Sequence, residues 1–153
     1  MTATNHAITG ALIGLAVSNP ALAVPLAFIS HFALDAIPHY DSPGYELERI
    51  GSTRFRKQLS IDASLCFLLV VVLALRRPEH WLVVAFSAFM ATFPDLLWLP
   101  KFLHVRTTGK LLPNNNFFWK FHDKIQWRTG SKYIWVEATW FIVFGGLLSI
   151  SLL

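Results

Sequence analysis

The segment HFALDAIPHYD places four ionisable side chains at the end of a long apolar run. His31 and Asp35 are four residues apart, so a helix would present both on one face. His39 and Asp41 follow Pro38, near which the helix is expected to end. Converging imidazole nitrogens and carboxylate oxygens are ligands for zinc, manganese or iron. If such a site leaves one position to water, it can activate that water for hydrolysis.

Further ionisable side chains lie at a similar depth in other apolar segments. His6 begins the first segment, and Asp95 lies about one turn before the end of the fourth. Asp62 and Glu137 lie about one turn into the third and fifth segments. Ionisable groups inside membrane segments are costly and usually mark function. Their shared depth therefore predicts one polar site built from several helices.

Asp35 and Asp95 are the first candidates for a metal or catalytic role. Each lies near a helix C-terminus, where the helix dipole disfavours a carboxylate, so each needs a cation, a hydrogen-bond donor or a proton. His6 and His31 come next. Two purely structural roles remain as alternatives. Asp62 could stabilise a helix N-terminus, and loop Arg or Lys residues could pair with the acids in an ion-pair network. Weaker candidates are His39, Asp41, Asp62 and Glu137, with His122 and Asp123 as a lid over the site.

The composition is that of a membrane protein. The chain has 153 residues, enough for one domain, with 54% hydrophobic and 14% charged residues, whereas soluble domains carry about 25% charged residues. Apolar segments are expected at about residues 4–17, 20–37, 58–75, 80–99 and 133–153. A full span needs roughly 17 to 20 residues, so the first two segments could form a short hairpin.

The predicted fold is an all-α polytopic membrane helix bundle, forming a single domain over residues 1–153. It has about five membrane segments, and residues 4–37 and 58–100 are possible duplicated helix pairs. An amphipathic interfacial helix is expected at about residues 115–128, with Trp119 and Trp127 as anchors and Asn114 to Asn116 as possible N-caps. Gly145 and Gly146 are expected to let the last helix pack closely.

Lys and Arg residues are distributed unevenly between the two sides of this bundle. All of them except Arg76 and Arg77 fall on the side of the N-terminus. The positive-inside rule then places the N-terminus and the polar site in the cytoplasm, at the plasma (inner) membrane if the cell is prokaryotic. The expected partners of the basic loops are membrane lipids with anionic headgroups rather than nucleic acid. No oligomeric state follows from the sequence.

Several motifs together resemble one family. They are His6 in NHAITGALIG, the helix end HFALDAIPHYD, and Asp95 in FPDLLWL. Over roughly the first 100 residues the chain is similar to the predicted integral-membrane metal-dependent hydrolases. The resemblance implies a divalent metal, zinc or manganese, held by His6, His31, Asp35, His39 and Asp95. The usual second acid after the fourth helix is absent, since Leu96 and Leu97 follow Asp95.

The residues and the resemblance favour a membrane-embedded metal-dependent hydrolase that acts on a lipid or lipid-linked phosphoester. Asp35 or Asp95 would serve as metal ligand or general base. No G-x-S-x-G, H-E-x-x-H or glycine-rich phosphate loop points to another reaction. The alternatives are a non-catalytic lipid- or ion-binding membrane protein, a small transporter, or a polar cluster that only stabilises the fold.

Overall fold

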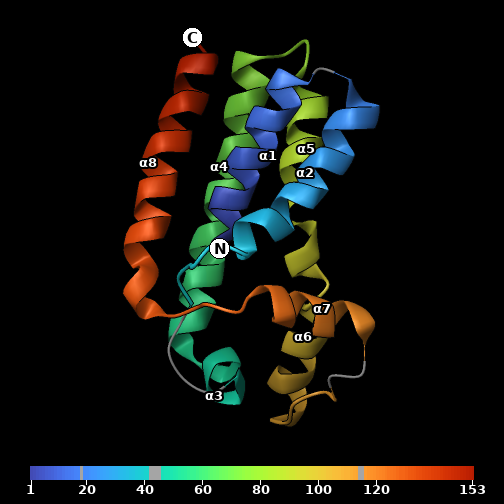
Figure 1. Ribbon diagram of the computed structural model, residues 1–153, viewed down its shortest axis with the longest axis vertical. Helices are drawn as coiled ribbons and strands as arrows, with labels where there is room; N and C mark the ends of the chain where they lie inside the picture. Colours follow the sequence, from blue (N-terminus) through green and yellow to red (C-terminus); the bar gives the residue numbers. More distant parts are fainter. Residues whose placement is uncertain (18, 42–45, 114–115) are drawn as a thin grey trace.

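The computed structural model describes residues 1–17, 19–41, 46–113 and 116–153, and over these residues it is helical and has no strand. The predicted all-α class is therefore confirmed. The helices are α1 (Ala3–Ala16), α2 (Pro20–Asp35), α3 (Glu46–Gly51), α4 (Thr53–Arg76), α5 (Trp81–Leu96), α6 (Leu99–Thr108), α7 (Phe117–Ile125) and α8 (Ile134–Ser151), the last preceded by the 3-10 turn Ser131–Tyr133. In Figure 1, α1, α2, α4, α5 and α8 form the upper bundle, while α3, α6 and α7 gather at its lower end.

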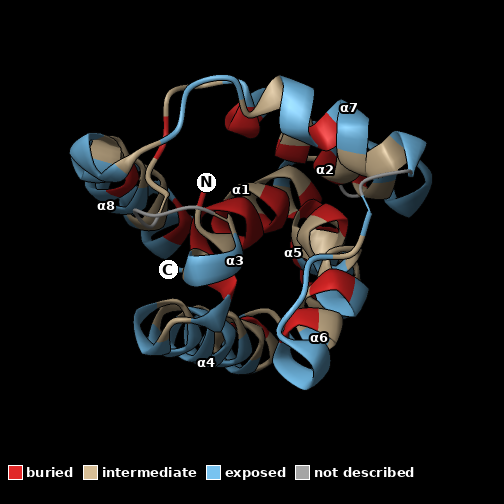
Figure 2. Cartoon of the chain, turned by 90° about the horizontal axis from the view of Figure 1, so that it is seen from below, coloured by how far each residue is buried: buried red, intermediate tan, exposed pale blue. Residues whose placement is uncertain are grey.

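Helix α1 forms the centre of the bundle, where Figure 2 shows it buried among α2, α4, α5 and α8. Small residues allow this central position. A Cβ added to Gly10 would lie 2.5 Å from the carbonyl oxygen of Ser87 and 2.7 Å from Cβ of Ala91. A Cβ added to Gly14 would lie 2.9 Å from Cα of Val84. The backbones of α1 and α5 therefore meet along a small-xxx-small pair of the kind used between membrane helices.

The expected close packing at Gly145 and Gly146 is wrong. A Cβ on Gly145 would meet nothing closer than a side-chain atom of Ile8 at 3.9 Å, and one on Gly146 would meet nothing within 4 Å. Helix α8 is long and mostly exposed at these positions, so glycine is not required there by a neighbouring helix. The close approach between helices occurs instead at Gly10 and Gly14, where α1 meets α5.

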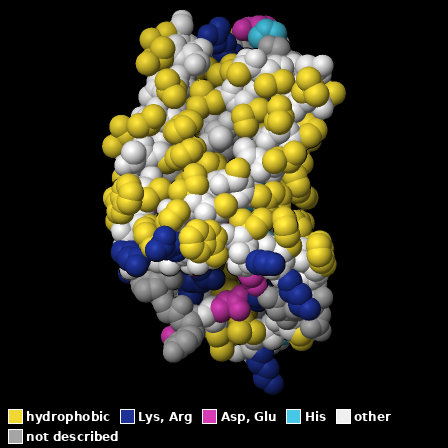
Figure 3. Space-filling view, in the orientation of Figure 1, with side chains coloured by type: hydrophobic (Ala, Val, Ile, Leu, Met, Phe, Trp, Pro, Cys, Tyr) yellow, Lys and Arg dark blue, Asp and Glu magenta, His cyan; other side chains and the backbone are white. Residues whose placement is uncertain are grey.

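Among the described residues, two helical segments are long and apolar enough to cross a membrane: Thr53–Arg76 and Ser131–Ser151. The pair α5 and α6, bent by 44° at its break, would make a third span. Helices α1 and α2 have 14 and 16 residues, below the lower limit of about 17. Two or three candidate spans are therefore present, and a bundle of five spans is not confirmed. In Figure 3, hydrophobic side chains cover much of the surface between a few charged side chains at the top edge and the charged lower end.

The helix boundaries differ from the expected ones at the lower end. Helix α4 begins at Thr53 because the Ser52 side chain accepts a hydrogen bond from the Phe55 N–H. Asp62 therefore lies more than two turns into the helix, not one. Helix α6 occupies a segment expected to be loop, and it ends at Gly109 with φ of 68°. The α6 segment mixes polar and apolar residues and lacks the continuous apolar run from which the five membrane segments were predicted.

Helix α7 begins at Phe117, where Asn116 accepts the Phe118 N–H and confirms one predicted N-cap; Asn114 and Asn115 lie outside the described residues. It is shorter than the segment 115–128. The Trp119 indole donates to the Leu97 carbonyl at 3.1 Å, and the Trp127 indole donates to the Ala36 carbonyl at 3.0 Å. Both tryptophans thus tie this segment to the ends of α5 and α2.

Candidate metal centre

Asp35 is the centre of the polar cluster. It is the last residue of α2 and is fully buried. A carboxylate at a helix C-terminus needs compensation, and groups from the first residues, α1, α2 and the α7 region surround it. Oδ1 lies 2.5 Å from the Met1 ammonium nitrogen and 3.1 Å from Nε2 of His6. Oδ2 lies 2.8 Å from Nε2 of Gln126, 3.1 Å from Nε2 of His122 and 3.2 Å from Nε2 of His31.

Four residues could hold a metal ion. His31, Asp35, Asp95 and His122 each offer one ligand atom, and these atoms lie within 4.8 Å of one another. Nε2 of His31 is 3.2 Å from Asp35 Oδ2 and 3.7 Å from Asp95 Oδ1. A tetrahedral ion with ligand bonds of about 2.0–2.2 Å separates its ligand atoms by roughly 3.3–3.6 Å. The spacing of these atoms therefore fits a divalent ion; the ion's identity is not specified by it.

The hydrogen bonding of His31 supports this fit. Nδ1 lies 2.8 Å from the carbonyl oxygen of Ala91, which can only accept, so Nδ1 carries the proton. In the neutral ring Nε2 then presents a lone pair to the oxygens of Asp35 and Asp95. A backbone carbonyl on the far nitrogen is the usual support of a metal-binding histidine. Three lone-pair-bearing atoms that face one another form a site that a cation would stabilise.

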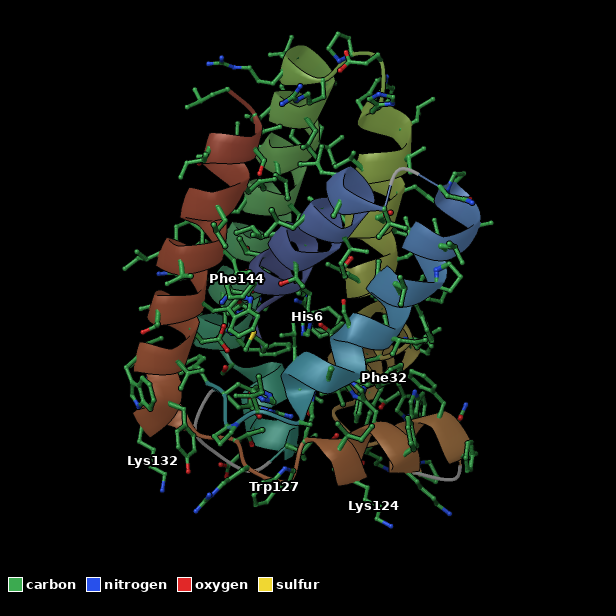
Figure 4. All side chains as sticks on the ribbon, turned by 45° about the horizontal axis from the view of Figure 1, so that its top comes forward. His6, Phe32, Lys124, Trp127, Lys132 and Phe144 are labelled. Carbon is green, nitrogen blue, oxygen red and sulfur yellow. The ribbon has the colours of Figure 1, made fainter. Side chains whose placement is uncertain are left out.

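His6 and His39 approach Asp35 from its other oxygen. His6 is fully buried, stacks on the His31 ring with centroids 4.1 Å apart, and contacts Oδ1 through Nε2. Figure 4 shows it in the interior, above the end where Trp127 lies. Nε2 of His39 lies 3.9 Å from Oδ1, and its Nδ1 donates to the Ile37 carbonyl at 2.8 Å. Burial and the N-terminal ammonium lower the pKa of His39, which favours the neutral ring. Metal ligation by these two residues stays a prediction.

Asp62 and Glu137 hold the start of α1. Oδ1 of Asp62 accepts the Thr4 hydroxyl at 2.6 Å and the Thr4 N–H at 3.3 Å. Oε2 of Glu137 accepts the Thr2 N–H at 3.1 Å and the Asn5 side-chain amide at 2.7 Å. The first N–H groups of a helix have no partner within the helix, and negative charge is favourable there. Asp62 of α4 therefore caps a backbone N–H of α1, while Glu137 of α8 holds Thr2, which precedes the helix, and the Asn5 side chain in its first turn.

The loop around Asp41 is also held to the lower end of the bundle. Asp41 forms an ion pair with Arg49 of α3. His39 pairs with the segment after α7 through two backbone hydrogen bonds, from its N–H to Arg128 and from Gly130 to its carbonyl. These contacts bring the loop beside the cluster, as expected from the turn at Pro38, without placing Asp41 among the four candidate ligands.

A cavity of about 680 Å³ opens beside the cluster. This volume lies within the usual range for small-molecule sites. Its lining combines polar groups near the cluster with apolar groups from α4, α5 and α6. The polar part includes Asp95, His122, Asp123 and Arg49, and the apolar part includes Leu59, Ala63 and Leu96. Figure 3 shows acidic side chains in a hollow near the lower end, with Lys and Arg side chains around it.

A scan against protein-family models and searches of curated proteins and solved structures find no match. The resemblance to membrane metal-dependent hydrolases therefore stays a prediction from short motifs.

The structure brings the main predicted residues together, but it changes which of the weaker candidates contact the cluster. His31, Asp35 and Asp95 converge as their shared depth predicted. His122, predicted as part of a lid, contributes a ring nitrogen to the cluster itself. Gln126, which contacts Asp35, was not predicted, although its spacing of four from His122 would place both on one face of a helix. Trp98, whose indole Nε1 lies 3.0 Å from Nδ1 of His122, was not predicted either.

Proposed function

We propose that this chain is a membrane-embedded, metal-dependent hydrolase that acts on a lipid or lipid-linked phosphoester. The observation that carries the proposal is the convergence of His31, Asp35 and Asp95 beside a cavity of about 680 Å³. A metal site alone is compatible with many functions. A metal site beside a cavity with one apolar wall favours a substrate that is itself polar at one end.

His31, Asp35 and Asp95 are the residues that would hold the ion. Three protein ligands leave one position for water or substrate, as catalytic zinc sites do. A divalent ion bound there would lower the pKa of a coordinated water and offset the negative charge of a phosphate group. His6 and Gln126 fix the orientation of the Asp35 carboxylate, because each contacts one of its oxygens at 3.1 Å and 2.8 Å respectively.

The reaction is hydrolysis of a phosphoester bond. The water oxygen bonds to phosphorus, the bond from phosphorus to the ester oxygen breaks, and the leaving alkoxide takes up the proton that water loses. Asp95 is the residue suited to accept that proton first. Its side chain is 34% exposed and lines the cavity, whereas Asp35 is fully buried and surrounded by the other polar groups of the cluster.

The cavity lining supports an amphiphilic substrate. Leu59 and Ala63 of α4 and Leu96 of α5 contribute apolar surface, and α4 is one of the candidate spans. Arg49, which pairs with Asp41, also lines the cavity, and its remaining guanidinium N–H groups can donate to a phosphate oxygen. We expect the remaining basic residues of this end to hold anionic headgroups at the cytoplasmic face, in line with the positive-inside rule.

The test uses purified protein in nanodiscs of defined lipid composition. Bound metals are measured by elemental analysis, and lipid products are measured by mass spectrometry after chelation and after addition of zinc or manganese. We expect metal-dependent product formation that falls about 100-fold or more in Asp95→Asn, because this change removes both a proposed metal ligand and the proposed general base. Asp123→Asn is the matched control, since it removes a carboxylate that lines the same cavity outside the proposed ligand set. A protein that binds no transition metal and converts no lipid would exclude this function.

A non-catalytic lipid- or ion-binding membrane protein is the second candidate. The observation that favours it is that Asp35 already has hydrogen-bonding groups of the chain at both oxygens, so the fold can bury it without an ion. The same nanodisc experiment separates the two candidates. Metal or lipid binding without product, together with metal-dependent lipid or ion movement, would favour the second.

A further inference from the structure

The position of a proton on His122 can be read from its contacts. The indole Nε1 of Trp98 lies 3.0 Å from Nδ1 of His122. An indole N–H only donates, so Nδ1 must present a lone pair. A neutral imidazole has one donor and one acceptor nitrogen, and the proton of His122 therefore resides on Nε2, the nitrogen that faces Asp35.

In the metal-free protein a second contact agrees with this assignment. Nε2 of His122 lies 2.9 Å from Nε2 of His31, and two ring nitrogens this close share a single proton. His31 cannot provide it as a neutral ring, because its own proton is on Nδ1 and is donated to the Ala91 carbonyl. The shared proton therefore belongs to His122. An ion on Nε2 of His31 would take the lone pair of that nitrogen and leave the His122 N–H to Oδ2 of Asp35.

We propose that Trp98 holds His122 as a hydrogen-bond donor to the metal centre, so that His122 is a positioning residue and not a metal ligand. This inference rests on the proposed metal-binding function. A histidine ligates through a nitrogen that carries no proton. For Nε2 of His122 to ligate, the proton would move to Nδ1 and face the Trp98 N–H, leaving two donors opposed at 3.0 Å.

The surrounding side chains keep the Trp98 indole in place. Trp98 lies in the turn between α5 and α6, and its ring packs against Trp119 with centroids 5.9 Å apart. The ammonium group of the buried Lys101 lies 4.2 Å from the centre of the Trp98 ring. The indole is therefore fixed from two sides, and its N–H direction is determined by tertiary packing.

The consequence for the site is a directed N–H group beside the ion. The Nε2–H of His122 has Asp35 Oδ2 within 3.1 Å, and His122 also lines the cavity. It can orient the carboxylate ligand in the absence of substrate and donate to a phosphate oxygen when substrate occupies the cavity. His122 thus adds a neutral donor beside Asp95, an acid that lines the same cavity.

The first experiment is a zinc titration of the purified full chain by competition with a chelating dye. His122→Gln keeps a side-chain N–H donor, so the loss of zinc affinity should stay below about tenfold. Asp95→Asn removes a proposed ligand, and its loss should exceed about 100-fold. Trp119→Phe is the control for Trp98→Phe, because Trp119 stacks on the same ring but donates to Leu97. Equal losses in His122→Gln and Asp95→Asn would overturn the inference.

The second experiment is ¹⁵N nuclear magnetic resonance of histidine-labelled protein, with the His122 signals assigned by their absence in His122→Gln. The metal-free protein should show His122 protonated at Nε2, and Trp98→Phe should add the form protonated at Nδ1, whereas Trp119→Phe should not. A wild-type His122 protonated at Nδ1 would overturn the inference. If the protein binds no zinc, the proposed function fails, and this second experiment decides the tautomer without it.

Discussion

Gly10 gives the clearest test of the packing that brings α1 and α5 together. Replacing it with alanine would add a Cβ 2.5 Å from the Ser87 carbonyl oxygen and 2.7 Å from Cβ of Ala91. Ordinary contact begins at 3.4 Å, and both obstacles are rigid, since one is backbone and the other is attached directly to it. The two helices must therefore separate. Overpacking of this kind costs about 1–3 kcal/mol.

Gly146→Ala is the matched control, because the same Cβ meets nothing within 4 Å there. Both substitutions gain the higher helix propensity of alanine, about 1 kcal/mol. The difference between the two variants therefore isolates the clash, and we expect Gly10→Ala to be less stable by about 1–3 kcal/mol. The assay is equilibrium unfolding in mixed micelles, followed by tryptophan fluorescence.

Zinc affinity should fall in parallel. Helix α1 carries His6, which orients the Asp35 carboxylate, and α5 carries Asp95, so a shift of α1 against α5 disturbs the geometry of the site. If Gly10→Ala matches Gly146→Ala in unfolding free energy, the close contact between α1 and α5 does not exist in the folded protein, and the arrangement of the cluster would have to be revised.

Three further predictions concern the site and the elements that hold it. Chelation should lower the thermal midpoint of the wild type, since an ion at 100 times its dissociation constant adds about 2.7 kcal/mol; scanning calorimetry should show no such change for Asp95→Asn. Asp62→Ala should destabilise the protein by about 0.5–2 kcal/mol, because it removes the acceptor for Thr4 at the start of α1, while elemental analysis shows an unchanged metal content. Glu46→Gln should destabilise the protein more than Lys101→Met, because it leaves the charge of Lys101, which is 2% exposed, buried without its partner, whereas Glu46 is 32% exposed. Unfolding free energies of the two variants measure this difference, and equal losses would contradict the prediction.

The sequence alone was sufficient to predict the helical class and the proximity of His31, Asp35 and Asp95. Apolar runs are visible without a structure, and His31, Asp35 and Asp95 interrupt or end such runs at one side. Because consecutive short-linked helices are antiparallel, a residue near the end of one helix lies near the start of the next. This simple geometry predicted that His6, at the start of α1, would meet Asp35, at the end of α2.

Tertiary structure decided the roles within that cluster. Asp62 and Glu137 were predicted at the same depth as Asp35, but their oxygens accept hydrogen bonds from residues at the start of α1. No pattern in the sequence distinguishes such an acid from a metal-binding one. Helix α6 was missed because its polar residues contact neighbouring elements, as Lys101 does with Glu46. The role of His122 depends on Trp98, which lies 24 residues away in the chain. Side-chain chemistry and helix period are local properties, whereas the direction of a hydrogen bond between distant segments exists only once the helices have packed.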